Sequence, residues 1–199
     1  MSSAEIELKF AVRSSDKLRA QLPSLGLTLL TPRTLEQNTL YDTPDRSLRE
    51  QKQILRIRSY DGRWTLTYKR PPTGDTLVDL RFKLRYETET EVANGPALGE
   101  VFEHLGYLPA FKYEKYREEW LHAETGSHVV IDETPIGTWA ELEGSPDWID
   151  AMLAGLGIPS EDSTTDSYGR LFLSWKEQTG HPAENLTFEE IALDTVPAR

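Results

Sequence analysis

Charged and apolar residues alternate strictly along much of this chain, and this alternation constrains the fold more than any other feature of the sequence. The stretch from Lys83 to Glu91 reads KLRYETETE, with a charged residue at every second position. Because successive side chains of a β-strand point to opposite faces, such a stretch forms a strand with one charged face. Strand-like alternation occurs in residues 4–12, 36–42, 53–59, 63–70, 80–92, 113–121, 127–133 and 137–143.

The charged residues of both signs share the charged faces of these strands. The basic side chains are Lys9, Arg56, Arg58, Lys69, Lys83, Arg85, Lys115 and Arg117. The acidic side chains are Glu5, Glu7, Glu87, Glu89, Asp132, Glu141 and Glu143. An open antiparallel sheet with one solvated face explains any single strand, but it predicts charges mixed with Ser, Thr and Gln without order. A closed barrel explains the repeated order, because all charged faces then point into one narrow lumen.

Segments with helical spacing of apolar residues lie between and after the strands, at 14–25, 96–105, 145–156 and 165–176. Their apolar sides are available to cover the apolar faces of the strands. The sequence therefore predicts an α+β fold, an eight-stranded antiparallel closed β-barrel with flanking helices. The last segment, 177–199, is predicted either to carry a short helix near 188–193 or to be a loosely attached tail.

The net charge of the chain restricts the ligands that it can bind. Acidic residues number 33 and basic residues 22, which gives a formal net charge of -11 and argues against nucleic acid as a partner. Buried charges of both signs are costly without partners. A triphosphate would supply negative charge for the Lys and Arg side chains. Mg²⁺ or Mn²⁺ would supply positive charge for the carboxylates, whose hard oxygens these ions prefer.

The sequence also excludes several other kinds of site and location. It contains no cysteine, so disulfides, thiolate metal sites and cysteine nucleophiles are ruled out. We find no secretory signal and no apolar stretch of the ~20 residues that span a bilayer. We therefore expect a cytoplasmic protein with no membrane contact.

Short motifs built on the charged residues follow one another along the chain. They are Glu5-Ile6-Glu7-Leu8-Lys9, Tyr41-Asp42-Thr43-Pro44, Leu55-Arg56-Ile57-Arg58, Leu66-Thr67-Tyr68-Lys69, Lys83-x-Arg85-x-Glu87-x-Glu89, Glu114-Lys115-Tyr116-Arg117, Asp132-Glu133, Glu141-Leu142-Glu143-Gly144 and Ser167-Tyr168. The ordered set resembles the signature of the CYTH, or triphosphate tunnel metalloenzyme, superfamily. The resemblance covers residues 4–176, so we expect a tunnel domain at 1–176 and a C-terminal tail at 177–199.

The resemblance implies an eight-stranded tunnel, a triphosphate substrate and a divalent metal, Mg²⁺ or Mn²⁺. It implies a metal-associated acidic set of Glu5, Glu7, Glu87, Glu89, Asp132, Glu141 and Glu143, with one ion expected at Glu5, Glu7 and Glu143. It implies a substrate-binding set of Lys9, Arg56, Arg58, Lys69, Lys83, Arg85, Lys115 and Arg117. The catalytic residues are expected to be Glu5, Glu7, Lys9 and Arg58. Tyr168 is expected to pack the closing helix rather than to contact substrate.

The family resembled here contains inorganic, thiamine and RNA triphosphatases and class IV adenylyl cyclases, so the reaction stays open. We favour hydrolysis of inorganic triphosphate, thiamine triphosphate or a nucleoside triphosphate, because no base-recognition pocket can be located in the sequence. The rival is an adenylyl cyclase that makes cyclic AMP and pyrophosphate from ATP. A further alternative is a non-catalytic module that binds polyphosphate or nucleotide. In each case the partner is a small molecule, and the chain is expected to be a monomer or a homodimer.

Overall fold

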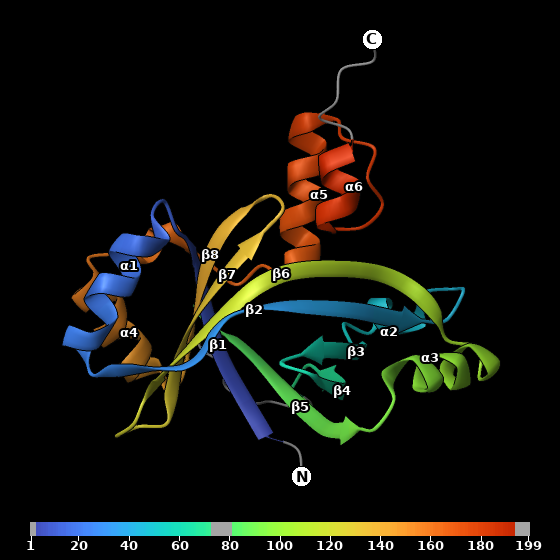
Figure 1. Cartoon of the computed structure of the whole chain (residues 1–199), viewed down its shortest axis with the longest axis horizontal. Coiled ribbons are helices and arrows are strands. Elements are labelled where there is room, and N and C mark those ends of the chain that lie inside the picture. Colours follow the sequence, from blue (N-terminus) through green and yellow to red (C-terminus); the bar gives the residue numbers. More distant parts are fainter. Residues whose placement is uncertain (1–2, 73–80, 194–199) are drawn as a thin grey trace.

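The strands of this chain close into a barrel. A computed structural model describes residues 3–72 and 81–193 (Figure 1). The barrel strands are β1 (Ser3–Ala11), β2 (Leu27–Asp42), β3 (Ile54–Tyr60), β4 (Arg63–Arg70), β5 (Lys83–Val92), β6 (Leu108–His122), β7 (Ser127–Thr134) and β8 (Gly137–Glu143). They pair antiparallel in the order β5-β4-β3-β2-β6-β7-β8-β1, and β1 pairs in turn with β5. The predicted α+β fold with an eight-stranded antiparallel closed β-barrel is confirmed.

The N-terminal strand β1 closes the barrel because it pairs along both of its edges. Residues Ser3 to Glu7 of β1 pair with β5, and residues Glu7 to Ala11 pair with β8. The two-residue strand β9 (Ser163–Thr164) pairs with Lys9 and Phe10, where β5 no longer reaches. Closure of this kind removes the free edges that an open sheet would expose to solvent.

Two strands are longer than their sequence pattern predicts. The predicted strand 36–42 is the second half of β2, and the predicted strand 113–121 lies within β6. The first half of β2 contains Pro32, its pairing with β6 is irregular, and most of its side chains are exposed. Residues exposed on both faces need no alternation, so this half of β2 shows no strand pattern. The predicted strand 80–92 begins at Lys83 in the structure, and Leu80 lies outside the described residues.

Helices flank the barrel, and all of them except a short one at Ser47–Glu50 overlap segments that the sequence predicts to be helical. They are α1 (Ser15–Gln21), α2 (Ser47–Glu50), α3 (Gly95–His104), α4 (Pro146–Leu156), α5 (Tyr168–Thr179) and α6 (Phe188–Leu193), with 3-10 turns at Leu22–Leu25 and Ser160–Asp162. The hydroxyl of Ser145 accepts from the backbone N–H of Trp148, and that of Ser167 from Arg170, so a serine caps both α4 and α5. No helix within residues 3–72 and 81–193 has the length and apolar character needed to cross a lipid bilayer.

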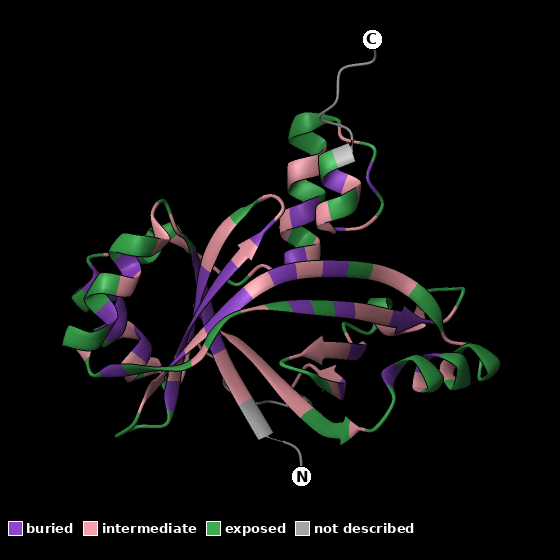
Figure 2. Ribbon diagram, in the orientation of Figure 1, coloured by how far each residue is buried: buried purple, intermediate pink, exposed green. Residues whose placement is uncertain are grey.

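Buried apolar side chains form two clusters, one on the outer side of the barrel wall and one where α5 and α6 meet β6. In the first, Leu8, Val129 and Leu142 from the strands pack with Ile149 and Leu153 of α4. The second, which we call the aromatic cluster, consists of Tyr113, Tyr168, Phe172, Ala183, Leu186 and Ile191 and lies under α5 and α6. Buried and partly buried residues alternate along β6 from Tyr113 to Arg117, and most residues of β7 are buried (Figure 2). Because the apolar faces of the strands contact the helices, the charged faces point into the lumen.

The Tyr-Asp-Thr-Pro motif forms a turn at the end of β2. Asp42 is buried, and its carboxylate accepts from the backbone N–H groups of Thr43 at 2.8 Å, Leu48 at 2.9 Å and Arg49 at 3.1 Å. The N–H groups of Leu48 and Arg49 belong to the first turn of α2, where a carboxylate satisfies donors that the helix itself leaves free. This motif of the family signature therefore has a structural role here.

The C-terminal segment 181–193 packs against β6. Ala183, Leu186 and Ile191 are buried in the aromatic cluster, and α6 occupies the predicted 188–193. The predicted boundary at residue 176 falls inside α5, so the part of 177–199 that the structure describes continues the packed domain. Residues 194–199 lie outside the described residues.

Candidate functional site

The lumen of the barrel is crossed by ion pairs between strands that are not neighbours in the sheet. Arg117 of β6 binds Glu141 of β8 at 2.6 Å, although β7 lies between these strands. Lys69 of β4 binds Glu5 of β1 at 2.6 Å, although β5 lies between them. Because the sheet is closed and the opposite faces of these strands carry apolar residues that contact the helices, these pairs lie inside the barrel. The predicted charged faces therefore meet in one lumen.

Three of the predicted acidic residues form a cluster at one part of the lumen. One carboxylate oxygen from each of Glu5, Glu7 and Glu143 lies within 4.8 Å of the others. The register places Glu7 of β1 directly opposite Glu143 of β8, which brings these two carboxylates together. Burial raises the pKa of Glu143 to about 8, and the negative charges of Glu141 and Glu5 add to this rise. We call these residues the acidic trio.

Two lysines neutralise part of the acidic trio. Lys69 binds Glu5 at 2.6 Å and Glu87 at 2.9 Å, and Lys83 forms an ion pair with Glu7. Burial alone would lower the pKa of Lys69, but nearby carboxylates including Glu5 and Glu87 outweigh it and raise the pKa above its ordinary value. Both predicted substrate-binding lysines therefore lie beside predicted metal ligands, and Lys69 remains charged at neutral pH.

Asp132 forms the centre of a second, deeper cluster. It is 0% exposed and accepts hydrogen bonds from Arg117 Nε at 2.8 Å, Arg117 Nη2 at 2.7 Å, Lys115 Nζ at 2.8 Å and Tyr168 Oη at 2.6 Å. Glu141 joins this cluster by binding Arg117 at 2.6 Å and Lys9 at 2.5 Å. Asp132 and Glu141 thus lie among cations, although the resemblance places both in the metal-associated set.

The wall made by β3 and β5 carries a third group of ion pairs. Arg58 binds Glu89 at 3.2 Å, and Arg56 lies 4.0 Å from Glu87 and 3.9 Å from Glu89. Arg85 stands on the same face of β5 and donates to the carbonyl of Leu84 at 3.2 Å. Within the described residues, no ion pair joins Arg85 to an acid. Among the predicted phosphate-binding groups, the guanidinium of Arg85 can therefore bind a phosphate without first leaving a carboxylate partner.

Glu36 belongs to the charged lumen, although the sequence analysis did not select it. It is 0% exposed on β2 and lies 3.4 Å from Lys115, 3.6 Å from Arg117 and 3.9 Å from Arg58. Burial acts to raise its pKa, but Lys115, Arg117, Arg56 and Arg58 outweigh this and lower the pKa to about 2. The signal was present in the sequence, because Glu36 alternates with Asn38 in the predicted strand 36–42. With Glu36 included, eight acidic side chains balance the eight basic ones.

Two tyrosines also reach the lumen. Tyr168, at the start of α5, packs in the aromatic cluster as predicted, but its hydroxyl in addition donates to Asp132 at 2.6 Å. The hydroxyl of Tyr113 on β6 accepts a hydrogen bond from Arg56 at 3.1 Å. Tyr113 alternates with Lys115 and Arg117 along β6, so the strand pattern already places it on the charged face, whereas the position of Tyr168 at a helix start gives no such signal.

The acidic trio fits a hard divalent cation. Carboxylate oxygens are the ligands that Mg²⁺ and Mn²⁺ prefer, and three of them converge at this point of the lumen. Within residues 3–72 and 81–193 no other three acidic or histidine side chains come together in this way. The remaining predicted metal-associated residues, Glu87, Glu89, Asp132 and Glu141, lie instead against lysine or arginine.

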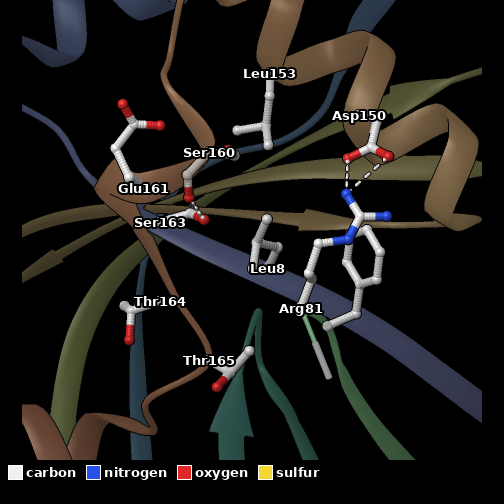
Figure 3. A pocket seen from close by; sticks show the side chains of 10 residues that line it. Leu8, Arg81, Asp150, Leu153, Ser160, Glu161, Ser163, Thr164 and Thr165 are labelled. Carbon is white, nitrogen blue, oxygen red and sulfur yellow. Dashed lines mark hydrogen bonds and ion pairs between the residues drawn. The ribbon is translucent and has the colours of Figure 1, made fainter. Parts of the chain in front are cut away.

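A hollow of about 420 Å³ lies outside the barrel wall and does not contain the predicted site (Figure 3). Leu8 of β1 and Leu153 of α4 form its apolar part, Thr164 of β9 lies on its wall, and an ion pair between Arg81 and Asp150 lines it. None of the predicted catalytic, substrate-binding or metal-associated residues lines this hollow.

Comparison with known proteins relates both the sequence and the fold to one family. The model of the CYTH domain family matches residues 3–145. The protein MJ0240 of Methanocaldococcus jannaschii, a candidate adenylate cyclase by name, is 28% identical over 142 residues, which cover 71% of this chain and 77% of that protein.

Solved structures show the same fold. A candidate adenylate cyclase from Vibrio parahaemolyticus has a TM-score of 0.74 at 19% identity, covering 87% of this chain and 99% of that one. HpAC1 from Hippeastrum, a candidate adenylyl cyclase described as having a dominant triphosphatase activity, has a TM-score of 0.59 at 21% identity, covering 88% and 96%. At these identities the likeness concerns the fold alone.

Proposed function

This chain belongs to the CYTH domain family, and we propose that it is a metal-dependent triphosphatase that hydrolyses a phosphoanhydride bond of a triphosphate held in the barrel lumen. The observation that carries the proposal is the acidic trio, which lies in the same lumen as eight lysine and arginine side chains. A metal ligand set beside a dense set of phosphate-binding cations is what phosphoryl transfer requires, because this chemistry depends on positioning and charge neutralisation. The triphosphatase activity described for the Hippeastrum protein supports hydrolysis as the reaction.

The basic side chains would bind the triphosphate by exchanging partners. Lys9, Arg56, Arg58, Lys69, Lys83, Lys115 and Arg117 each contact at least one carboxylate. Phosphate oxygens replace carboxylate oxygens as acceptors, so the cations need not be desolvated anew when substrate enters. Arginine adds geometric selectivity, because its planar guanidinium can bind two phosphate oxygens at once.

The acidic trio would hold the Mg²⁺ or Mn²⁺ ion, and the bound ion would supply positive charge at the phosphate oxygens. Lys69 and Lys83 now neutralise Glu5 and Glu7. With these carboxylates engaged by a metal, both ammonium groups are left to the phosphates. We therefore expect metal and triphosphate to bind with positive coupling.

Hydrolysis needs water to attack a phosphorus atom while the bond to the bridging oxygen breaks. Lys9 and Arg58 would stabilise the charge that develops on the phosphate oxygens, and a carboxylate of the lumen would accept the proton from water. The products are then orthophosphate and a diphosphate compound. The proposed catalytic residues remain Glu5, Glu7, Lys9 and Arg58.

Cyclisation of ATP is the second candidate, and the name of the Methanocaldococcus jannaschii relative favours it. The same cations and metal would hold the triphosphate, but the nucleophile would be a hydroxyl of the ribose, and pyrophosphate would leave. The two reactions therefore differ in their products and not in the residues of the lumen.

A substrate panel tests the proposal. The protein is incubated with tripolyphosphate, thiamine triphosphate or ATP in Mg²⁺ or Mn²⁺, and phosphate, pyrophosphate and cyclic AMP are measured. We expect release of orthophosphate with at least one substrate, and Glu5→Gln should abolish it. Glu91→Gln is the matched control, because Glu91 lies on the same kind of strand face but its side chain is 69% exposed at the rim.

The outcomes of this panel separate the alternatives. Cyclic AMP and pyrophosphate from ATP, with tripolyphosphate left intact, would show that the reaction is cyclisation. Tight binding of tripolyphosphate by calorimetry without turnover in either metal would favour a binding module. Unchanged turnover in the Glu5→Gln protein would remove the acidic trio from the reaction.

A further inference from the structure

Two stacked tyrosines connect the aromatic cluster with the charged lumen. The ring centroids of Tyr113 and Tyr168 lie 6.1 Å apart with planes inclined by 29°, and both residues are buried. Their hydroxyl groups bind two different side chains of the lumen. Tyr168 Oη donates to Asp132 at 2.6 Å, and Tyr113 Oη accepts from Arg56 at 3.1 Å. Each tyrosine therefore has its ring in the core and its hydroxyl on a side chain of the lumen.

The ring of Tyr168 also contacts two of the proposed phosphate-binding lysines. The Nζ atoms of Lys9 and Lys115 lie 4.3 Å and 4.7 Å from the centroid of this ring. An ammonium group at this distance is attracted by the aromatic face, most strongly where water is excluded. Tyr168 thus contacts Lys9 and Lys115 through its ring, and through its hydroxyl it contacts the Asp132 carboxylate that binds Lys115.

The C-terminal segment 181–193 supports the tyrosine pair from outside the barrel. β7 pairs with β6 only from Tyr116 onward, so residues 112–114 of β6 have no partner from β7. Leu186 occupies this stretch of edge: its N–H donates to the carbonyl of Lys112 at 3.0 Å, and its carbonyl accepts from the N–H of Glu114 at 2.9 Å. The Leu186 side chain is 0% exposed within the aromatic cluster. The segment therefore adds to the sheet beside Tyr113 while its side chain packs under the tyrosines.

We propose that Tyr168 and Tyr113 are positioning residues, held in place by Leu186, that orient Lys9, Lys115 and Arg56 for phosphate binding. This inference rests on the proposed function. It makes substrate binding depend on α5 and the C-terminal segment, which lie beyond the residues 3–145 that the family model matches.

Packing alone does not account for Tyr168. A phenylalanine would fill the same space without a hydroxyl that must find a partner when buried. The Tyr168 hydroxyl keeps its proton, because burial and the neighbouring Asp132 raise the pKa of the phenol well above its ordinary value. It therefore acts as a permanent donor to the carboxylate that receives Lys115 and Arg117.

The first experiment compares Tyr168→Phe with Phe172→Leu. Phe172 lies on the same helix and in the same aromatic cluster, but its ring contacts Phe111, Trp175 and Lys176, and within the described residues no ion pair, hydrogen bond or cation–π contact joins it to the proposed phosphate-binding side chains. In the Tyr168→Phe protein we expect KM for the best substrate of the panel to rise about tenfold with little change in kcat. The variant loses the hydrogen bond to the charged Asp132, which holds the phosphate-binding Lys115 and Arg117 in place. The Mn²⁺ concentration for half-maximal turnover should stay unchanged, because in the part of the chain that the structure describes Tyr168 contacts Asp132, Lys9, Lys115 and Tyr113 and no member of the acidic trio. Phe172→Leu should lower Tm and leave KM unchanged.

The second experiment tests support from the C-terminal segment. Leu186→Ala should raise KM in the same direction as Tyr168→Phe, and the exposed Glu189→Ala on the same segment should not. The inference is overturned if Tyr168→Phe binds and turns over substrate as the wild type does, or if Phe172→Leu raises KM equally. A wild-type protein that neither binds nor hydrolyses any triphosphate would instead overturn the proposed function itself.

Discussion

Asp132→Asn is expected to destabilise the folded protein severely, because Asp132 is the counter-ion of the deep cluster. Its carboxylate is 0% exposed and accepts four hydrogen bonds, three of them from Lys115 and Arg117. Asparagine has nearly the same shape but carries no charge and turns an acceptor into a donor facing these cations. Both cations are buried, with side chains 3% and 9% exposed, so water cannot replace the lost charge.

The magnitude follows from the cost of an uncompensated buried charge. Removing one partner of a buried ion pair costs about 3–5 kcal/mol. Glu36 and Glu141 still contact Arg117, which places the expected loss at the lower end of this range. For a protein of this size the loss corresponds to a decrease in Tm of about 10 °C. Urea denaturation followed by tryptophan fluorescence would measure it.

Asp150→Asn is the matched control for this measurement. The side chain of Asp150 is 44% exposed in an ion pair with Arg81 on the outer face, so the same chemical change should cost less than about 0.5 kcal/mol. Tripolyphosphate should restore part of the stability of Asp132→Asn by supplying negative charge to Lys115 and Arg117. If Asp132→Asn unfolds at the urea concentration of the wild type yet no longer responds to Mn²⁺, Asp132 is a metal ligand and the reasoning is refuted.

Three further predictions concern the trio, the pH dependence and the turn at the end of β2. Glu7→Gln should remove the increase in Tm that Mn²⁺ gives the wild-type protein, measured by thermal melting with and without the ion; an unchanged increase would exclude Glu7 as a ligand. Glu36→Gln should lower the free energy of unfolding by about 3 kcal/mol at pH 7. The folded-state pKa of Glu36 is about 2, so its ionised form stabilises the fold at every pH above its unfolded-state pKa. The difference in unfolding free energy between wild type and Glu36→Gln should therefore shrink as pH falls from about 4.5 toward 2, and urea titrations at pH 7 and pH 3 that gave equal differences would contradict this. Asp42→Ala should lower the free energy of unfolding by about 1–2 kcal/mol in the same urea titration, since Asp42 caps α2. It should leave KM in the substrate assay unchanged, and an altered KM would contradict its structural role.

The strands that line the lumen were predictable because their two faces have opposite environments. Residues 53–59, 63–70, 127–133 and 137–143 alternate between lumen and core, and each predicted range lies within about one residue of an observed strand. The first half of β2 was not predictable, because its side chains are largely exposed and carry no period. Apolar and polar residues alternate where one face of a strand is buried, so a strand that is exposed on both faces shows no alternation.

The composition of the charged lumen was predictable, but its pairing was not. The sequence placed Glu5, Glu7 and Glu143 at one expected ion, and the structure brings these three together. The acidic set as a whole divides further, because Asp132 stands opposite Arg117 and Glu141 opposite Lys9 on neighbouring strands. Which acid meets which cation depends on strand register and tilt, and neither can be read from a single strand. The lumen contact of Tyr168 was hidden because an aromatic residue at a helix start usually indicates core, whereas Tyr113 shares the face of Lys115 and Arg117 in the predicted strand 113–121.

The closure of the barrel by β1 has a consequence for folding. Glu5 and Glu7 stand near the start of the chain, and Glu143 comes from β8, the last strand of the barrel. The carboxylates of the trio therefore stay apart until β1 has paired with β8, a contact of high sequence separation that forms slowly. A nascent or partly folded chain has not assembled the proposed metal site, so under the proposed function neither ion nor triphosphate would guide the early steps of folding. Both ligands would act only on the closed barrel, where they would slow its reopening.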